Sequence, residues 1–431
     1  MGSTVIPIPS EDGASFSEKK KTKSSLFSLL PCLTQKRSIH DYRKLIHSIK
    51  VGIALVLVSL LYLVGPLYKE FGENAMWAIM TVVVVFEFFA GATLSKGLNR
   101  GMGTILGGGL GCLAAILSQK VGGIGNSITI GISVFVFGAA ATYSRLVPSI
   151  KRRYDYGAVI FILTFNLVVV SGLRAGKVIE LACERLSTIG MGFTICLFTN
   201  LLICPVWASD ELHCSIASKF ENLACSIEGC LEEYFIMINE KKENQPITSF
   251  DGYKSVLHSK SKDESLANFA RWEPWHGKFG HNYPWDKYLQ IGELLRELAA
   301  TIISLKGCLQ SPQQPPLLLR HSVKEPCEVM ASLLACTLRE LGESIMNMRR
   351  CQPRVLIMPK LQSKRLELSI SMTPSKLGSQ ENGGLAIAGF VFLLMEMVDK
   401  VEVLAKEVEE LGDLSDFSIN SNLTVQIWGC I

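Results

Sequence analysis

Four basic side chains stand inside or beside long apolar runs. Arg100 lies at the entry to one run and Arg185 about one turn inside another, while Arg174 and Lys96 lie at run ends. Charged groups in lipid usually face the interior of a helical bundle or a wet path. A guanidinium binds a carboxylate through two parallel hydrogen bonds. These bases therefore indicate an anion pathway, and membrane anchors or salt-bridge partners are the alternative reading.

One acidic residue lies deep in the apolar sequence. Glu87 is embedded in the valines and phenylalanines of residues 82–89. We expect it to pair with an arginine of a neighbouring span and to fix the position of that arginine, which would support the pore. Proton coupling is the alternative role for an acid at such a position.

An aromatic string at 272–277 carries a third group of polar side chains. It reads Trp-Glu-Pro-Trp-His-Gly and contains Trp272, Glu273 and His276. A single acid without the spacing of zinc ligands does not fit a metal site, so no metal or other cofactor is predicted. We expect its tryptophans to wedge between helices while Glu273 caps a helix or pairs with a base. The string would then form a rigid plug that gates or supports a pore.

Six apolar runs must position these side chains. Hydrophobic residues make up 48% of the chain and charged residues only 19%, and nearly all of the apolar excess precedes Trp207. A spanning helix needs about 20 mostly apolar residues. Six spans are predicted, near 47–66, 75–94, 100–118, 126–146, 157–173 and 183–205. The alternative, a soluble protein with buried strands or helices, is disfavoured by the lengths of the runs.

Glycines four residues apart mark the third predicted span. Gly103, Gly107 and Gly111 would form a smooth helix face that another backbone can approach closely. A phosphate-binding loop is excluded because no Gly-Lys-Ser/Thr sequence follows.

Loop charges orient the predicted spans. The segment before the first span is rich in Lys and Arg, and Lys96 and Arg100 fall in the next loop on the same side. Because basic residues mark cytosolic loops, we place both termini in the cytosol. The net charge of only +4 does not suggest a nucleic-acid partner, and the 13 scattered cysteines are typical of free thiols in a reducing compartment.

The sequence after Trp207 has the periodicity of soluble helices. Apolar residues recur at three- and four-residue steps through 212–235, and 287–309, 326–349 and 385–411 repeat the pattern. We predict an all-α protein in which a six-span transmembrane helical domain is followed by a cytosolic helical bundle. The predicted domains are a basic cytosolic segment (1–45), the membrane domain (46–207), a helical domain (208–352), a linker (353–384), a final helix (385–412) and a tail (413–431).

Several strings together resemble the plant aluminium-activated malate transporter family. The similarity extends over about 40–350 and resumes in 390–412, and it is carried by residues 74–88, 91–94, 96–100, 140–145, 154–157, 185–188, 204–207 and 272–277. The resemblance implies a homodimeric channel in membrane lipid that passes malate and other anions passively. Arg100 and Arg185 match positions where the family places pore arginines, and Glu273 matches one linked to gating. Lys96 and Arg174 are added from their placement alone.

The resemblance leaves other functional classes to be weighed. A proton-coupled secondary exporter of organic anions is the main alternative, with Glu87 as the coupling residue. An enzyme is not predicted, because the sequence has no recognisable nucleophile–base pair, metal cluster or nucleotide loop. Location is left open between the plasma and vacuolar membranes, with the plasma membrane favoured.

The aluminium response of the family is not expected in this chain. Trivalent aluminium would need clustered carboxylates on the outer face, and the acid-rich loop of responsive members is replaced here by the basic sequence at 171–177. The nearest acid to that loop is Glu180, and Lys69 precedes Glu70 and Glu73 in the first outer loop.

Overall fold

A computed structural model describes residues 26–63, 75–172, 178–236, 251–280, 283–309, 317–350, 358–371 and 381–419. The regular secondary structure of the described residues is helical, apart from two-residue strands β1 (Arg349–Arg350) and β2 (Ser418–Ile419), which pair in parallel. The all-α prediction is therefore confirmed. The chain divides into two compact units, Met1–Gly52 and Ile53–Ile431, and α1 (Leu26–Leu63) contains the boundary between them.

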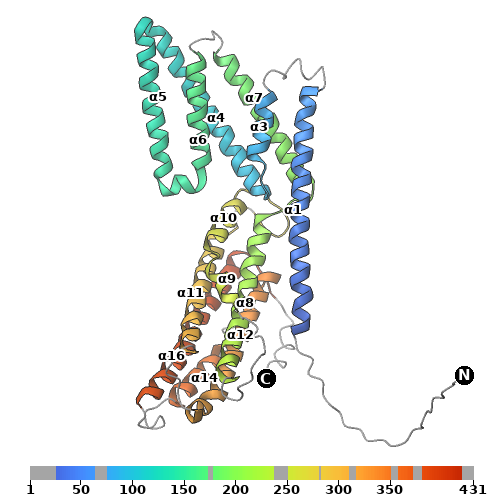
Figure 1. The fold of residues 1–431 in the computed structure, drawn as a ribbon, viewed down its shortest axis with the longest axis vertical. Coiled ribbons are helices and arrows are strands. Elements are labelled where there is room, and N and C mark those ends of the chain that lie inside the picture. Colours follow the sequence, from blue (N-terminus) through green and yellow to red (C-terminus); the bar gives the residue numbers. More distant parts are fainter. Residues whose placement is uncertain are drawn as a thin grey trace, which may run out of the picture. The chain divides into compact units, whose positions relative to one another are not determined.

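Four described helices are long and apolar enough to cross a membrane. Their apolar segments are Ala90–Val121, Gly123–Leu146, Pro148–Val170 and Cys183–Leu202, and a shorter apolar helix covers Met76–Val85. The helices concerned are α3 (Ala75–Val85), α4 (Ala90–Val121), α5 (Gly123–Leu146), α6 (Pro148–Gly172) and α7 (Val178–Leu202). α6 packs against both α4 and α5, and α7 packs against α3 and α4 (Figure 1).

The prediction of one continuous span over 75–94 is wrong. α3 ends at Val85, residues 86–89 are non-helical, and α4 begins at Ala90. The helix predicted over 100–118 therefore begins ten residues earlier, at residue 90. Lys96 and Arg100, expected in a loop, lie inside this helix. Apolar composition alone does not reveal the break, because the run at 82–89 is equally apolar on both sides of Glu87.

Close packing of α4 on α6 confirms the predicted role of the spaced glycines. A Cβ atom added to Gly103 would lie 2.5 Å from the carbonyl oxygen of Gly157, and one added to Gly107 would lie 2.7 Å from that of Phe161. At Gly111 the added atom would be 3.1 Å from Val168. Only a residue without a side chain lets the two backbones approach so closely.

The connection from α4 to α5 is a tight turn. Gly122 and Gly123 have φ angles of +66° and +54°, in the left-handed region that side chains disfavour. α6 begins at Pro148, whose fixed φ and missing N–H suit the first position of a helix. The two glycines and Pro148 therefore allow α4, α5 and α6 to fold back on one another as three neighbouring helices.

The remaining helices form a bundle with one large apolar core. It comprises α8 (Ala208–Ile236), α9 (Gly252–Leu257), α10 (Lys260–Ala270), α11 (Trp285–Leu309), α12 (Leu317–Asn347), α14 (Met358–Ser371) and α16 (Glu381–Leu414). α8 packs on α12 and α11, and α16 packs on α11 and α12 (Figure 1). Fully buried side chains at helical spacing, such as Leu212, Ile216 and Phe220, fill the core.

A buried ion cluster fixes α10 within this bundle. Asp263 of α10 pairs with Lys219 of α8, and its carboxylate lies 3.3 Å from the Arg296 guanidinium of α11. All three side chains are buried, so loss of one partner would leave an uncompensated charge. This matters for the site because the 272–277 string follows directly from α10.

Candidate functional site

Arg100 is buried inside α4 without an acidic partner among the described residues. Its Nη1 donates a hydrogen bond to the Tyr156 hydroxyl of α6 at 3.1 Å. Its Nε is buried and has no hydrogen-bond partner in the described part of the chain. Only 5% of the residue is exposed. A positive charge is therefore held in an apolar helix with donor capacity left over.

Arg185 shows a similar arrangement on another helix. It lies in α7, and its guanidinium carbon sits 4.6 Å from the centre of the Trp77 ring of α3. The face of an indole attracts a cation without neutralising its charge. The Nε of Arg185 also lacks a hydrogen-bond partner among the described residues. Each of the two arginines is thus held by a different neighbour, and Arg174 lies outside the described residues.

Glu87 pairs with a lysine rather than with an arginine of a neighbouring span. Its carboxylate accepts a hydrogen bond from the Lys96 ammonium group, which belongs to the first turns of α4. Both side chains are more than one-third exposed. The expected partner was wrong because the helix break brings Glu87 next to the helix that follows it in the chain.

The backbone groups released by the break at 86–89 find specific partners. The Glu87 N–H donates to the Thr93 hydroxyl at 3.0 Å, and the Asn200 amide donates to the Glu87 carbonyl at 3.1 Å. The Ala90 N–H donates to the Val206 carbonyl at 3.0 Å. Non-helical backbone at membrane depth is tolerated only where such groups are satisfied within protein or face water. Thr93 and Asn200 therefore hold the Glu87–Lys96 pair in place.

Glu273 caps the first helix of the bundle. This is one of its two predicted roles, the other being an ion pair with a base. Its carboxylate accepts hydrogen bonds from the N–H groups of Ala208 at 2.6 Å and Ser209 at 3.2 Å, in the first turn of α8. A negative group is favourable at a helix N-terminus. Burial nevertheless raises the pKa of Glu273, and the hydrogen bonds from α8 oppose that effect.

His276 joins the same corner through its ring. The ring stacks on Trp207 with 3.7 Å between centres and 14° between planes. Its Nδ1 lies 2.8 Å from the Pro274 carbonyl, and its Nε2 lies 3.1 Å from the Ser209 hydroxyl. A carbonyl can only accept, so Nδ1 carries the proton and, in the neutral ring, Nε2 accepts from Ser209.

The two tryptophans of the string behave differently. Trp272 is half-buried and lies under the Arg153 guanidinium of α6, 5.0 Å from the ring centre. Trp275 is 76% exposed in this chain, so it does not wedge between helices as expected. Arg153 was not predicted to contribute, although its position in a basic loop between apolar runs was a usable signal.

The 272–277 string also touches the start of α4. A Cβ atom added to Gly91 would clash with the Phe269 carbonyl of α10 and lie 2.7 Å from Cγ of Glu273. The corner therefore brings Glu273, Trp272 and His276 together with the start of α8 and the start of α4. Asn200 and Thr93 were missed by the sequence reasoning, although polar residues within apolar runs are the signal that would have found them.

Comparison with known proteins shows the family of this chain. The profile of the family described as "Aluminium activated malate transporter" matches residues 36–383. The chain is 45% identical over 353 residues to Aluminum-activated malate transporter 14 of Arabidopsis thaliana, covering 80% of this chain and 65% of that protein. It is 47% identical over 316 residues to transporter 12 of the same plant, covering 73% and 56%.

A relative from wheat is covered more completely. Aluminum-activated malate transporter 1 of Triticum aestivum is 37% identical over 399 residues, covering 88% of this chain and 83% of that protein. The chain spans less than two-thirds of the length of the two Arabidopsis relatives above.

Four described helices that are long and apolar enough to cross a membrane are typical of a helical membrane protein. The particular family follows from the match over most of the chain and from the identities above. This chain belongs to the aluminium-activated malate transporter family.

Proposed function

We propose that this chain is an anion channel that passes malate, together with other organic or inorganic anions, passively through an arginine-lined pore. The observation that supports this most strongly is the state of Arg100 and Arg185, which have no carboxylate partner among the described residues. The names of the relatives supply the proposed substrate.

Other basic residues in the apolar helices differ from Arg100 and Arg185 because they have acidic partners. Lys96 is paired with Glu87, and Arg145 is paired with Asp155 at 2.8 Å. These bases are compensated within the described chain, whereas Arg100 and Arg185 keep a full positive charge for a mobile anion. We therefore assign the main anion contacts to the two arginines. Lys96 has a smaller role, because its ammonium group must leave the Glu87 carboxylate before it can pair with an anion. Arg174 stays a candidate from its sequence position.

The two arginines can be tested by charge removal. Arg100→Gln and Arg185→Gln should each lower malate conductance about tenfold or more, because a hydrogen bond to a charged group contributes about 1.5–3 kcal/mol and about 1.4 kcal/mol corresponds to a factor of ten. Voltage clamp of cells expressing each variant measures the effect. If both variants reach the membrane in the same amount as the parent and conduct malate normally, the two arginines do not line the pore.

Lys120→Gln is the matched control. Lys120 lies in the last turn of α4, the helix that holds Arg100, and is exposed. The Lys120→Gln variant loses one positive charge, as the arginine variants do, but Lys120 is not assigned to the anion pathway. The malate conductance of this variant should therefore stay near that of the parent.

We also infer the wider arrangement of the protein. The apolar second half of α1 and the α3 helix would complete six spans with the four long helices, and the bundle would lie in the cytosol with both termini. The rigid corner formed by Glu273, Trp272 and His276 would bias opening of the pore, in a homodimer embedded in the plasma membrane. Support comes from the contacts of this corner with α4 and α8.

We further propose that the chain lacks activation by aluminium. The outer loops on which this rests, including Lys69, Glu70, Glu73 and Arg174, lie outside the described residues. An increase in malate current on addition of external aluminium would contradict the proposal.

A further inference from the structure

Trp275 is the exposed tip of the 272–277 string. Its side chain is 76% exposed in this chain, and Pro274 and Gly277 beside it are exposed as well. Gly277 has a φ angle of +53°, in the left-handed region, so the chain turns sharply just after the indole. The contacts on the two sides of this tip indicate what surrounds it.

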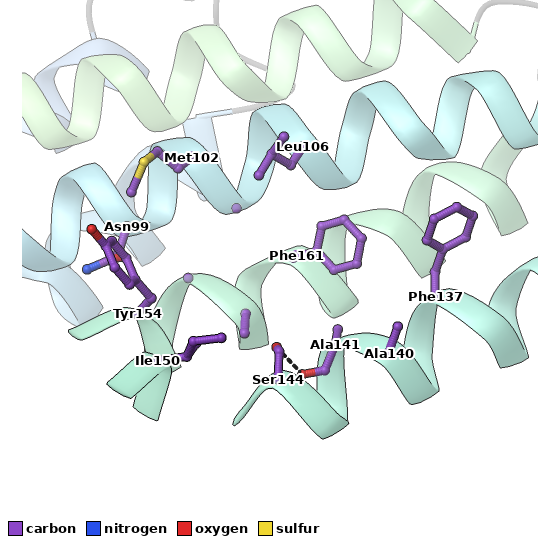
Figure 2. Close-up of a pocket in the computed structure, with 13 residues that line it drawn as sticks. Asn99, Met102, Leu106, Phe137, Ala140, Ala141, Ser144, Ile150, Tyr154 and Phe161 are labelled. Atoms are coloured by element: carbon purple, nitrogen blue, oxygen red, sulfur yellow. Dashed lines mark hydrogen bonds between the residues drawn. The ribbon is translucent and has the colours of Figure 1, made fainter. Parts of the chain in front are cut away.

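On one side of Trp275, the string is fixed to the start of α6. The centre of the Trp272 ring lies 5.0 Å from the Arg153 guanidinium. The Arg153 carbonyl in turn accepts a hydrogen bond from Nδ2 of Asn99 in α4 at 3.2 Å. Asn99 and Tyr154 line the same cavity between these two helices (Figure 2). Trp272 therefore belongs to the corner in which the start of α6 packs on α4.

On the other side of Trp275, the string is fixed to the segment that follows α7. His276 stacks on Trp207 with 3.7 Å between the ring centres. α7 ends shortly before this tryptophan, at Leu202. Both α6 and α7 contain an apolar segment long enough to cross a membrane. Trp275 is therefore held between the start of one spanning helix and the end of another.

The charges of α6 indicate where the membrane surface lies. α6 has 25 residues, whereas about 20 residues cross the hydrocarbon core. All of its charged residues stand within its first eight positions, namely Lys151, Arg152, Arg153 and Asp155. The apolar remainder fills the core, so these charges lie at the level of the lipid headgroups. Arg153 holds Trp272 at that level, and the three residues on to Trp275 span at most about 11 Å.

Two bases close to the tip are available to anions. Arg153 and Lys278 are exposed and have no ion pair among the described residues. The ring of Trp272 attracts the Arg153 guanidinium without neutralising its charge. The acid of the string, Glu273, accepts hydrogen bonds from the N–H groups of α8 instead. The tip therefore combines an open indole with uncompensated positive charge.

We propose that Trp275 and Lys278 anchor this corner to anionic lipid at the membrane surface. The indole inserts among the headgroups beside α6, and Lys278 and Arg153 pair with their negative charges. Tryptophan is enriched at membrane surfaces, and each base near such a surface favours anionic lipid. A soluble anion would satisfy the bases but would leave the indole in water. This lipid contact is separate from Arg100 and Arg185 and does not depend on malate conduction.

Quenching of tryptophan fluorescence by brominated lipid tests the insertion of the indole. The purified full chain is reconstituted in vesicles of phosphatidylcholine and phosphatidylglycerol whose acyl chains carry bromine close to the headgroup. Trp275→Phe removes one of the six tryptophans of the chain. Because this indole lies among the lipids, the fraction of the emission that bromine quenches should fall. Phenylalanine keeps a ring at an exposed position, so the fold should be retained.

Trp285→Phe is the matched control. Trp285 is only 5% exposed and belongs to the apolar core of the bundle, so lipid does not reach it. Its removal takes away unquenched emission and should raise the quenched fraction. The two variants therefore change the same quantity in opposite directions.

Moving the bromine from one lipid to the other tests the role of charge. At equal mole fraction, brominated phosphatidylglycerol should quench the emission that depends on Trp275 more strongly than brominated phosphatidylcholine. Lys278→Gln should lower this preference by up to about fivefold, the factor that one base near an anionic surface contributes. Lys360→Gln removes the same charge from an exposed position of α14, which packs on α12 and α16, and should keep the preference.

Two results would overturn the lipid anchor. The first is an unchanged quenched fraction in Trp275→Phe, and the second is equal quenching of the parent by the two brominated lipids. If Trp275→Phe leaves the quenched fraction unchanged but yields a smaller oligomer, the indole contacts a second copy of the chain instead.

Discussion

At the scale of single residues, Glu273 connects the aromatic string to the bundle. Glu273→Ala would leave the amides of Ala208 and Ser209 without an acceptor and should destabilise the protein by about 1–3 kcal/mol. Glu273→Gln keeps one acceptor oxygen and should cost less. Thermal unfolding of the purified chain measures both variants. Glu232→Ala, at an exposed position of α8, is the control, and a Glu273→Ala protein as stable as this control would contradict the capping role.

The raised pKa of Glu273 gives a second measurement on the same residue. The folded chain holds the proton of this carboxyl to a higher pH than the unfolded chain does. The stability contributed by Glu273 is therefore greatest below the ordinary pKa of a glutamate and declines as the pH rises through the raised folded value. The difference in stability between the parent and Glu273→Gln should decline over that window. A difference independent of pH would contradict the assigned cause.

A residue's role could be predicted where it follows from the neighbouring sequence, but not where it depends on tertiary contacts. The chemical types of Arg100, Arg185 and Glu273 were visible as charges in unusual sequence contexts. The partner of Glu87 was not visible, because it depends on a helix break whose backbone groups are satisfied by Thr93 and Asn200. Asn200 lies 113 positions after Glu87, and a hydrogen bond between residues so far apart leaves no mark in local periodicity.

At the scale of helices, the contact between α4 and α6 makes a direct prediction. Gly107→Ala would place a Cβ atom 2.7 Å from the Phe161 carbonyl and should destabilise the protein by about 1–3 kcal/mol. Gly109→Ala meets nothing within 4 Å and is the matched control on the same helix. Thermal unfolding should separate the two variants clearly. Equal unfolding temperatures would show that α4 and α6 do not pack as described.

The limits of the helices were predicted unevenly. The spacing of Gly103, Gly107 and Gly111 was sufficient to predict a close helix contact, since the geometry depends on a single repeating interval. The end of α3 at Val85 was not predictable in the same way. Residues 86–89 are apolar or aromatic apart from Glu87, and their non-helical state depends on partners from α4, α7 and the segment before α8.

At the scale of the whole molecule, the membrane helices and the bundle meet through specific contacts. Gly91 at the start of α4 lies against Phe269 and Glu273, and Arg153 of α6 lies over Trp272. A rearrangement of this corner would therefore displace the non-helical residues before α4 and the Glu87–Lys96 pair. The sequence predicted an all-α chain with an apolar first half, but these contacts depend on packing between segments that are distant in sequence.

The central claim is that uncompensated guanidiniums in the membrane helices make a passive path for anions. Reversal potentials of the purified protein in a planar bilayer test it most directly. A tenfold gradient of malate dianion should move the reversal potential by about 30 mV toward the malate equilibrium value, and a proton gradient should not move it. A reversal potential that follows the proton gradient, with coupling lost in Glu87→Gln, would contradict the channel and favour the coupled exporter.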